Sequence, residues 1–382
     1  IAHAKAEYEE YLRRYPDGRA VKRVRERLRA LALAARASRT GGGGGEDDER
    51  AWEFFGGVSQ LYRRDETQID NSVQSTNITS LNALLSDVDL VARRRGDRFD
   101  VSTRLSAGYV KDLLSGGPGD QTRVTTAFIE LADREREWKA RLGRQSRTSG
   151  GLFGTFDGIY AGYQLRPRLG LNLAFGYPVE RTTDSPQTGR QFIGIALDLG
   201  TFREAWDLSL YGVSQRLAGE TDRQAVGTEV RYFKPGRTLV ALIDYDIHFQ
   251  ALNNALVLGT LELPGRWILG VNLDHRRSPS LSLRNALIGQ PVTTFDDLLT
   301  LFTPAELDQL ALDRSANSDL YSVSLSRPFG ERWQWTLDLA SLSTGATPGS
   351  GGVDPVPDSG RDNSVGIQGL VSGLFGGNDF SS

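Results

Sequence analysis

The sequence predicts an all-β transmembrane barrel of antiparallel strands, about 16 in number within a range of about 14 to 18, preceded by a short α-helical hairpin. Two observations carry this prediction. From about Trp52 to Phe375, short segments place an apolar residue at every second position, with small, polar or charged residues between them. No apolar run reaches the roughly 18 residues that a transmembrane helix needs. A closed barrel of strands that place their apolar face towards lipid and their polar face towards the interior explains both observations.

Composition excludes several classes of protein. The net charge is -3, and no basic stripe of the kind that neutralises phosphates is present, so no nucleic-acid partner is expected. The chain has no cysteine, which excludes a disulfide framework and thiolate metal sites and is compatible with an oxidising periplasm. Residues 1–5 are no secretory signal, so we expect that a signal was removed or that the chain is a fragment.

Residues 1–38 form the first predicted domain, a helical hairpin. Apolar residues recur there at helical spacing on either side of a break at Pro16–Gly18, namely Ala4, Tyr8, Leu12, Val21, Val24, Leu28 and Leu31. The stretch 6–33, with Tyr-Leu-Arg-Arg-Tyr-Pro-Asp-Gly at 11–18, resembles the end of a tetratricopeptide-repeat array of periplasmic proteins. One such hairpin cannot bury both faces, so the resemblance implies further repeats upstream.

Residues 39–50 are a predicted flexible linker, because five glycines at 41–45 precede four acidic residues at 46–49. Residues 51–382 form the predicted barrel. Its clearest segment sets Leu169, Leu171, Leu173, Phe175 and Tyr177 against Gly170, Asn172, Ala174 and Gly176. The same alternation marks 99–109, 193–200, 226–232, 239–248, 267–274, 321–326 and 333–339. Alternation at 365–371 marks the last expected strand, and the strand count is a lower estimate.

A soluble β-sandwich and a propeller are the alternatives that similar strands allow. Sandwich cores bury aromatic residues in the middle of strands, whereas membrane barrels place them at the ends, at headgroup level. Seven aromatic residues lie near segment ends and are the predicted girdle: Trp52, Trp138, Tyr177, Trp206, Trp267, Tyr321 and Trp333. This placement favours the membrane barrel.

The polar faces supply the predicted lumen lining. Its residues are Arg104, Lys139, Arg141, Asp198, Glu229, Arg231, Asp244, Asp246, Asp274 and Asp338. We expect Asp244 and Asp246 to pair with Arg104, Arg141 and Arg231 across the barrel, with Ca²⁺ binding as the alternative. Mixed signs predict no strong ion preference. No metal site and no cofactor are predicted.

Long insertions interrupt the strands at 71–81, 149–158, 278–317 and 345–362. The longest contains Thr303-Pro304-Ala305-Glu306, a capping box that predicts a helix of about ten residues. This segment either narrows the lumen or covers the rim. Gly143-Arg144-Gln145, followed by Gly154 and Phe156-Asp157-Gly158, resembles a stretch of porin-like barrels in which a glycine-rich turn joins strands.

No enzymatic activity is predicted. His248 shares a face with Asp244 and Asp246, and His275 follows Asp274. Outer-membrane phospholipases use a serine and a histidine on a barrel, but no spacing here singles out a nucleophile.

Helical repeats followed by a barrel of about 16 strands resemble the layout of outer-membrane exopolysaccharide exporters. The resemblance implies a porin-like channel in the outer membrane of a Gram-negative bacterium, used for secretion, with a periplasmic N-terminal segment. Implied partners are outer-membrane lipid, a polysaccharide or other polar polymer, and periplasmic proteins bound by the repeats. A partner for surface-lipoprotein delivery and a structural anchor without transport remain alternatives.

Overall fold

The computed structural model describes residues 51–70, 75–330, 332–372 and 380–381. The predicted helical hairpin and linker lie outside these residues. The fold described below is that of the unit formed by Glu53–Arg93 and Asp97–Ser382. No helix in the described part of the chain is long and apolar enough to cross a membrane.

Sixteen long strands and one strand of two residues belong to a single sheet. The strands are β1 (Trp52–Asp70), β2 (Ser75–Arg95), β3 (Phe99–Asp112), β4 (Gln121–Asp133), β5 (Trp138–Ser149), β6 (Leu152–Arg166), β7 (Leu169–Val179), β8 (Arg190–Phe202), β9 (Trp206–Leu217), β10 (Glu220–Lys234), β11 (Arg237–Asp246), β12 (Ala251–Leu263), β13 (Trp267–Ser278), β14 (Ala316–Phe329), β15 (Trp333–Thr344), β16 (Arg361–Ser372) and β17 (Phe380–Ser381).

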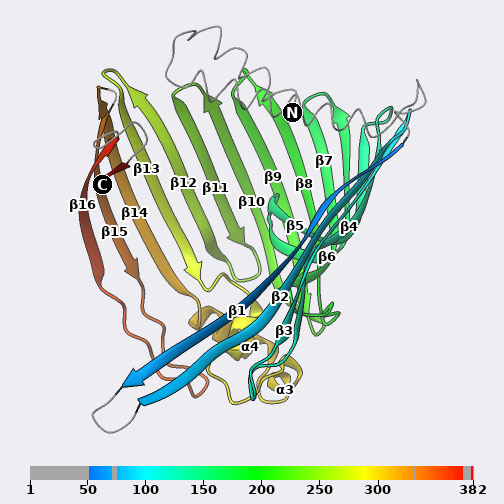
Figure 1. Ribbon diagram of the computed structural model, residues 1–382, viewed down its shortest axis with the longest axis vertical. Helices are drawn as coiled ribbons and strands as arrows, with labels where there is room; N and C mark the ends of the chain where they lie inside the picture. The colour runs from blue at the N-terminus through cyan, green and yellow to red at the C-terminus, as the bar shows by residue number, and fades with distance from the viewer. Residues whose placement is uncertain (1–50, 71–74, 331, 373–379, 382) are drawn as a thin grey trace. The chain divides into compact units, whose positions relative to one another are not determined.

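Neighbours in the chain are neighbours in the sheet (Figure 1). From β3 to β16 each strand pairs antiparallel with the next one. This up-and-down order is that of a barrel wall, and a sandwich would instead divide its strands between two sheets. The predicted all-β antiparallel barrel class and the number of strands are confirmed.

The two faces of the sheet differ in chemistry because strand side chains alternate. Leu173 on β7 lies opposite Ile195 on β8, and these side chains are 44% and 49% exposed. Their chain neighbours Ala174 and Ala196 are buried on the other face. We call the face that carries Ala196, Glu229 and Asp244 the inner face, and the apolar exposed face the outer face.

Three boundaries differ from the sequence prediction. Strand β11 ends at Asp246, so Ile247 and His248 belong to a turn. Strand β2 begins at Ser75 and takes up most of the insertion expected at 71–81, since its threonines suit a strand. The insertion expected at 149–158 is mostly strand β6, and only Gly150 and Gly151 form the turn.

The connections divide the sheet into two ends. At one end the connections between β2 and β15 are short: 96–98, 134–137, 167–168, 203–205, 235–236, 264–266 and 330–332. At the other end lie the longer loops 113–120, 180–189, 279–315 and 345–360. We call these the short-turn end and the long-loop end. Strand β1 begins at the short-turn end, because the β2–β3 turn lies there.

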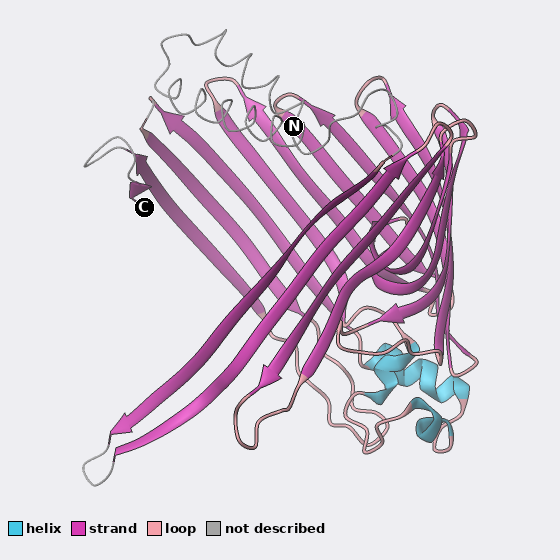
Figure 2. Cartoon of the chain, turned by 45° about the vertical axis from the view of Figure 1, so that its right-hand side comes forward, coloured by secondary structure: helices cyan, strands magenta, loops and turns pink. Residues whose placement is uncertain are grey.

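Loop 279–315 contains the 3-10 helix η2 (Leu283–Leu287) and the helices α3 (Phe295–Leu299) and α4 (Pro304–Asp313), which Figure 2 shows grouped below the strands. The capping box predicted for α4 is confirmed: the Thr303 hydroxyl accepts from the Glu306 amide, and the Glu306 carboxylate accepts from the Thr303 amide. The bonds that the Glu306 carboxylate accepts from the Thr303 amide and hydroxyl lower the pKa of Glu306. Both ends of the capping box therefore hold the helix start in one conformation.

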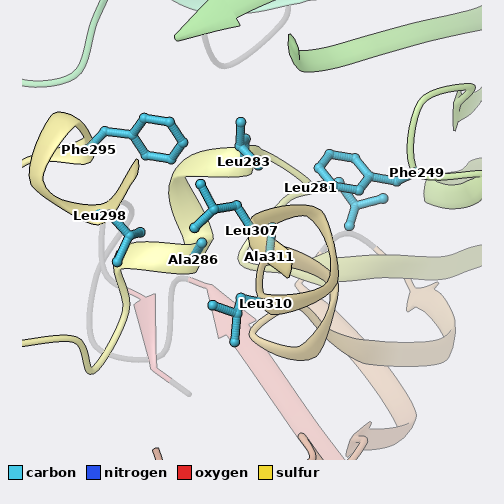
Figure 3. Packing of buried hydrophobic residues seen from close by; sticks show 9 residues of the cluster. All are labelled: Phe249, Leu281, Leu283, Ala286, Phe295, Leu298, Leu307, Leu310 and Ala311. Carbon is cyan, nitrogen blue, oxygen red and sulfur yellow. The ribbon is translucent and has the colours of Figure 1, made fainter. Parts of the chain in front are cut away.

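The loop has its own apolar core, drawn in Figure 3. Phe249 of the β11–β12 turn lies at one edge of this core, which otherwise consists of Leu281, Leu283, Ala286, Phe295, Leu298, Leu307, Leu310 and Ala311. Leu217 and Ala218 at the β9–β10 turn pack against the same core. These contacts are with strand ends at the long-loop end. Of the two alternatives for this segment, the contacts favour a cover over the rim.

Asp120 fixes the loop between β3 and β4 and provides a test by pH. Its carboxylate accepts from Lys111 Nζ at 2.7 Å, from the Tyr109 hydroxyl at 2.6 Å and from the Asp112 amide at 3.0 Å. The Lys111 and Tyr109 bonds lower the pKa of Asp120 from 3.8 to about 2. A depressed pKa stabilises the folded loop fully above the unfolded value and loses this contribution as the pH falls towards the folded value.

We therefore expect a nitroxide at Ser115→Cys, in a chain without other cysteines, to become mobile between about pH 4 and pH 2. In the Asp120→Asn variant the label should be mobile throughout this range. Electron paramagnetic resonance line widths measure the mobility. Identical, pH-independent spectra for both proteins would contradict the role of Asp120.

Candidate functional site

The hairpin of β5 and β6 leaves the sheet and folds over the inner face, and its far end curls away from the neighbouring strands in Figure 1. Pairing of β4 with β5 ends at Ala127 and Arg144. Beyond that point the β4 residue Val124 donates its amide to the Thr182 carbonyl of the β7–β8 loop instead, at 2.8 Å. Gly143 and Gly154 have φ of 122° and 142°, a region that only glycine enters readily. These two glycines therefore allow the bend.

The hairpin tip is fixed on the inner wall of β8, β9 and β10. The Gly150 amide donates to Glu229 Oε1 at 2.9 Å. A Cβ on Gly151 would lie 2.2 Å from Cδ2 of Tyr211, so only glycine fits against this ring. The Gly150 Cα faces Ala196, since a Cβ there would lie 3.1 Å from the Ala196 methyl. The tip thus occupies space that an open barrel would leave to solvent.

An apolar cluster lies between the hairpin and the wall. It consists of Phe156, Tyr160, Ala174, Phe192, Val213 and Ala225, all buried. The rings of Phe156 and Phe192 meet edge to face, with centroids 5.1 Å apart. The aromatic side chains of Phe156 and Phe192 on the inner face were not predicted, and the hairpin that carries Phe156 and covers Phe192 explains their position. Burial of these rings stabilises the docked position.

Arg144 ties the base of the hairpin to the β7–β8 loop. Its guanidinium binds both oxygens of Asp157, at 2.8 and 2.7 Å, and donates to the carbonyls of Val124, Thr182 and Asp184. The side chain is 7% exposed, so the charge is satisfied almost entirely by protein groups. A planar guanidinium can make this set of bonds, whereas a lysine ammonium cannot. The glycine-rich stretch that resembles porin-like barrels contains this arginine, but its contacts with the β7–β8 loop were not predicted.

Asp244 is the centre of a buried polar network behind the hairpin tip. It accepts from Arg223 at 2.6 Å, from the Tyr211 hydroxyl at 2.8 Å and from Asn253 at 2.9 Å. Asp246, which is fully buried, accepts from the Phe249 amide at 3.0 Å. The network stiffens the wall that receives the hairpin.

Sequence reasoning missed Tyr211, Arg223 and Asn253. The sequence carried one signal for Tyr211. Leu208 and Leu210 mark the outer positions of this strand, and Tyr211 falls on the alternate, inner positions. Nothing in the sequence marked Arg223 or Asn253 among the other polar residues.

The predicted pairing of Asp244 and Asp246 with Arg104, Arg141 and Arg231 is wrong. Those arginines bind carboxylates on their own strand or an adjacent one: Arg104 binds Asp89 at 3.1 Å, Arg141 binds Glu130 at 2.6 Å and Arg231 binds Glu229 at 3.0 Å. Side chains on the same face of adjacent strands lie about 5 Å apart, so an arginine there reaches a neighbouring carboxylate. Side chains on opposite walls of the barrel are too far apart to pair.

All ten residues predicted to line the lumen lie at inner-face positions. Asp198 accepts from Asn172 and Ser209, Lys139 lies 5.7 Å from the Tyr160 ring, Asp274 binds Arg276, and Asp338 is exposed on β15. Lys139, Asp198, Tyr160 and Asn172 line a cavity of about 810 Å³ beside the hairpin. Their role as a lumen lining stays a prediction.

The predicted girdle residues cluster by end. Trp52, Trp138, Trp206, Trp267 and Trp333 are the first residues of β1, β5, β9, β13 and β15, and all five lie at the short-turn end. Tyr177 and Tyr321 lie towards the long-loop end of β7 and β14. Trp206 stacks obliquely on Tyr232, with centroids 4.6 Å apart. Contact of these rings with lipid headgroups stays a prediction.

Comparison with known proteins gives structural likeness at low sequence identity. No protein-family model matches the chain, and no curated protein matches it by sequence. Solved structures that are similar include OmpT, an outer membrane protein of Vibrio cholerae, with 11% identity, a TM-score of 0.38, and coverage of 84% of this chain and 97% of that one. OprB of Pseudomonas putida has 9% identity, a TM-score of 0.42 and coverage of 84% and 93%. OccAB4 of Acinetobacter baumannii has 11% identity, a TM-score of 0.42 and coverage of 86% and 94%.

Proposed function

We propose that this protein is a channel of the bacterial outer membrane that carries a polar polymer such as an exopolysaccharide, narrowed by the docked β5–β6 hairpin. Membrane insertion is supported by the outer face. Leu142, Ile159, Ile195, Ile243 and Val323, at outer positions of five strands between β5 and β14, are each at least 40% exposed. An apolar surface of this extent is unfavourable in water and favourable in lipid.

The short-turn end and the long-loop end support one orientation of the barrel in the membrane. Outer-membrane barrels carry short turns on the periplasmic side and long loops on the outside. Strand β1 begins at the short-turn end, so the segment before Trp52 joins the barrel from the periplasm. Helical repeats in that segment would dock the proteins that synthesise or modify the polymer.

The docked hairpin is the observation that carries the channel proposal. Its tip is held by the bond from Gly150 to Glu229, and its base is held by Arg144. A hairpin held at its tip and at its base narrows the lumen through which an extended chain would pass. Asn172, Asp198 and Tyr160 in the 810 Å³ cavity supply groups that exchange hydrogen bonds with sugar hydroxyls. The proposal contains no chemical step.

Single-channel recording tests the proposal. The purified protein in a planar bilayer should give discrete conductance steps. In a second experiment, the protein purified from cells should carry the bound polymer with it. A barrel that inserts but stays silent would support the anchor alternative. A bound lipoprotein in place of a polymer would support the delivery alternative.

A further inference from the structure

The inner face has a charged part and a neutral part. The charged part is formed by β2–β11, where ion pairs join inner-face side chains: Arg104 binds Asp89, Arg141 binds Glu130 and Arg223 binds Asp244. The hairpin lies on this charged part, against β8–β10. The part of the lumen that the hairpin does not occupy therefore lies in front of the other strands.

The neutral part is the middle of β13–β16. Its inner positions form a register of small uncharged polar groups: Asn272 lies opposite Ser322, Gly270 opposite Ser324, Ser326 opposite Thr336, and Thr336 opposite Gln368. Among the described inner positions between Gly270 and Asn272, Ser322 and Ser326, Thr336 and Asp338, and Gly366 and Gln368, Asp338 is the one charged side chain. The charged residues Asp274, Arg276 and Asp362 lie at inner positions nearer the long-loop end. Short side chains keep this wall thin and widen the space in front of it.

A cavity at this wall contains a hydrogen-bond acceptor that has no donor among the described residues. The cavity, of about 260 Å³, extends from this wall over β11 and β12. Its polar lining residues are Thr238, Thr260, Asn272, Ser322 and Ser324, and the apolar residues Val240 and Leu258 also line it. The side-chain oxygen Oδ1 of Asn272 is buried and accepts no hydrogen bond from the described residues. A buried acceptor without a donor is unfavourable, and a solute hydroxyl would satisfy it.

We propose that the β13–β16 wall is a binding track for a neutral saccharide. Hydroxyl and amide groups match sugar hydroxyls, which both donate and accept, and each bond is weak enough to exchange as the chain moves. A carboxylated sugar would lose its hydration at this wall without gaining a cation in return. The inference rests on the proposed channel, and it names the substrate class.

The test compares hydroxyl deletions on the two parts of the inner face. Ser322→Ala/Ser324→Ala removes two hydroxyls from the track. The control Ser102→Ala/Ser106→Ala removes two from inner positions of β3 on the charged part. A neutral glucose hexamer and an anionic galacturonate hexamer are the probes, read by block of single-channel current and by isothermal titration calorimetry of the detergent-solubilised protein.

We expect the neutral hexamer to bind wild type and the control equally, and the track variant about tenfold more weakly. Ion conductance should not differ among the three proteins. Equal affinities in all three, or binding of the anionic hexamer alone, would overturn the proposal. If the protein is electrically silent, calorimetry still decides on the track, and the channel proposal fails separately.

Discussion

The Ile195→Arg variant is expected to be less stable in a bilayer, with a free energy of unfolding about 2–4 kcal/mol below that of the wild type. Cations on the lipid face of barrels near the midplane have this effect. Ile195 is 49% exposed and lies opposite both Leu173 and Gly212, in the middle of three strands. No carboxylate faces it from these two partners. In lipid the new charge would have neither water nor a counter-ion.

Arginine at Ser102 is the control. Ser102 is an inner-face residue opposite Glu130, so a guanidinium there has a carboxylate and water within reach. Its effect on folding should be within about 1 kcal/mol. Urea-dependent folding into lipid vesicles, followed by tryptophan fluorescence, measures both variants. Equal losses for the two, or a larger loss at Ser102, would contradict the assignment of the faces.

Valine at Gly151 should release the hairpin and raise single-channel conductance by at least about twofold, because the lumen of a barrel of this size is wide without an inserted loop. Two effects act together. Gly151 has φ of 74°, a conformation that costs a branched residue roughly 1–2 kcal/mol. The added Cβ would also lie 2.2 Å from the Tyr211 ring.

Gly119→Val separates these two effects. Gly119 has φ of 84°, and no atom lies within 4 Å of the place that its Cβ would take, so the variant has the backbone strain without the collision. It lies in the exposed β3–β4 loop. Conductance should be unchanged in this variant. If Gly151→Val conducts like wild type while remaining folded, the hairpin does not narrow the path.

The strands could be predicted because alternation is a local property. Leu169 to Tyr177 show which residues share a face without any knowledge of the neighbouring strands. The α4 capping box was equally local, since Thr303 and Glu306 are three residues apart. For both features, the physics that fixes the structure acts within a few residues.

The hairpin and the ion pairs could not be predicted because they depend on which strands meet. The sequence around Gly143 and Gly154 has the composition of a turn, and it bends inward only because Glu229 and Tyr211, distant in the chain, receive its tip. Alternation placed Asp244 on the inner face but left its partner open. Arg223 is that partner because β10 and β11 are adjacent.

Spin-label accessibility along neighbouring residues tests most directly whether lipid covers the outer face. The chain has no cysteine, so single substitutions at Asn172, Leu173, Ile195 and Asp198 carry one nitroxide each. In vesicles, collision with oxygen should exceed collision with a water-soluble nickel chelate at the outer-face positions Leu173 and Ile195, and the reverse should hold at the inner-face positions Asn172 and Asp198. Greater access of the nickel chelate at Leu173 and Ile195 would contradict the membrane barrel.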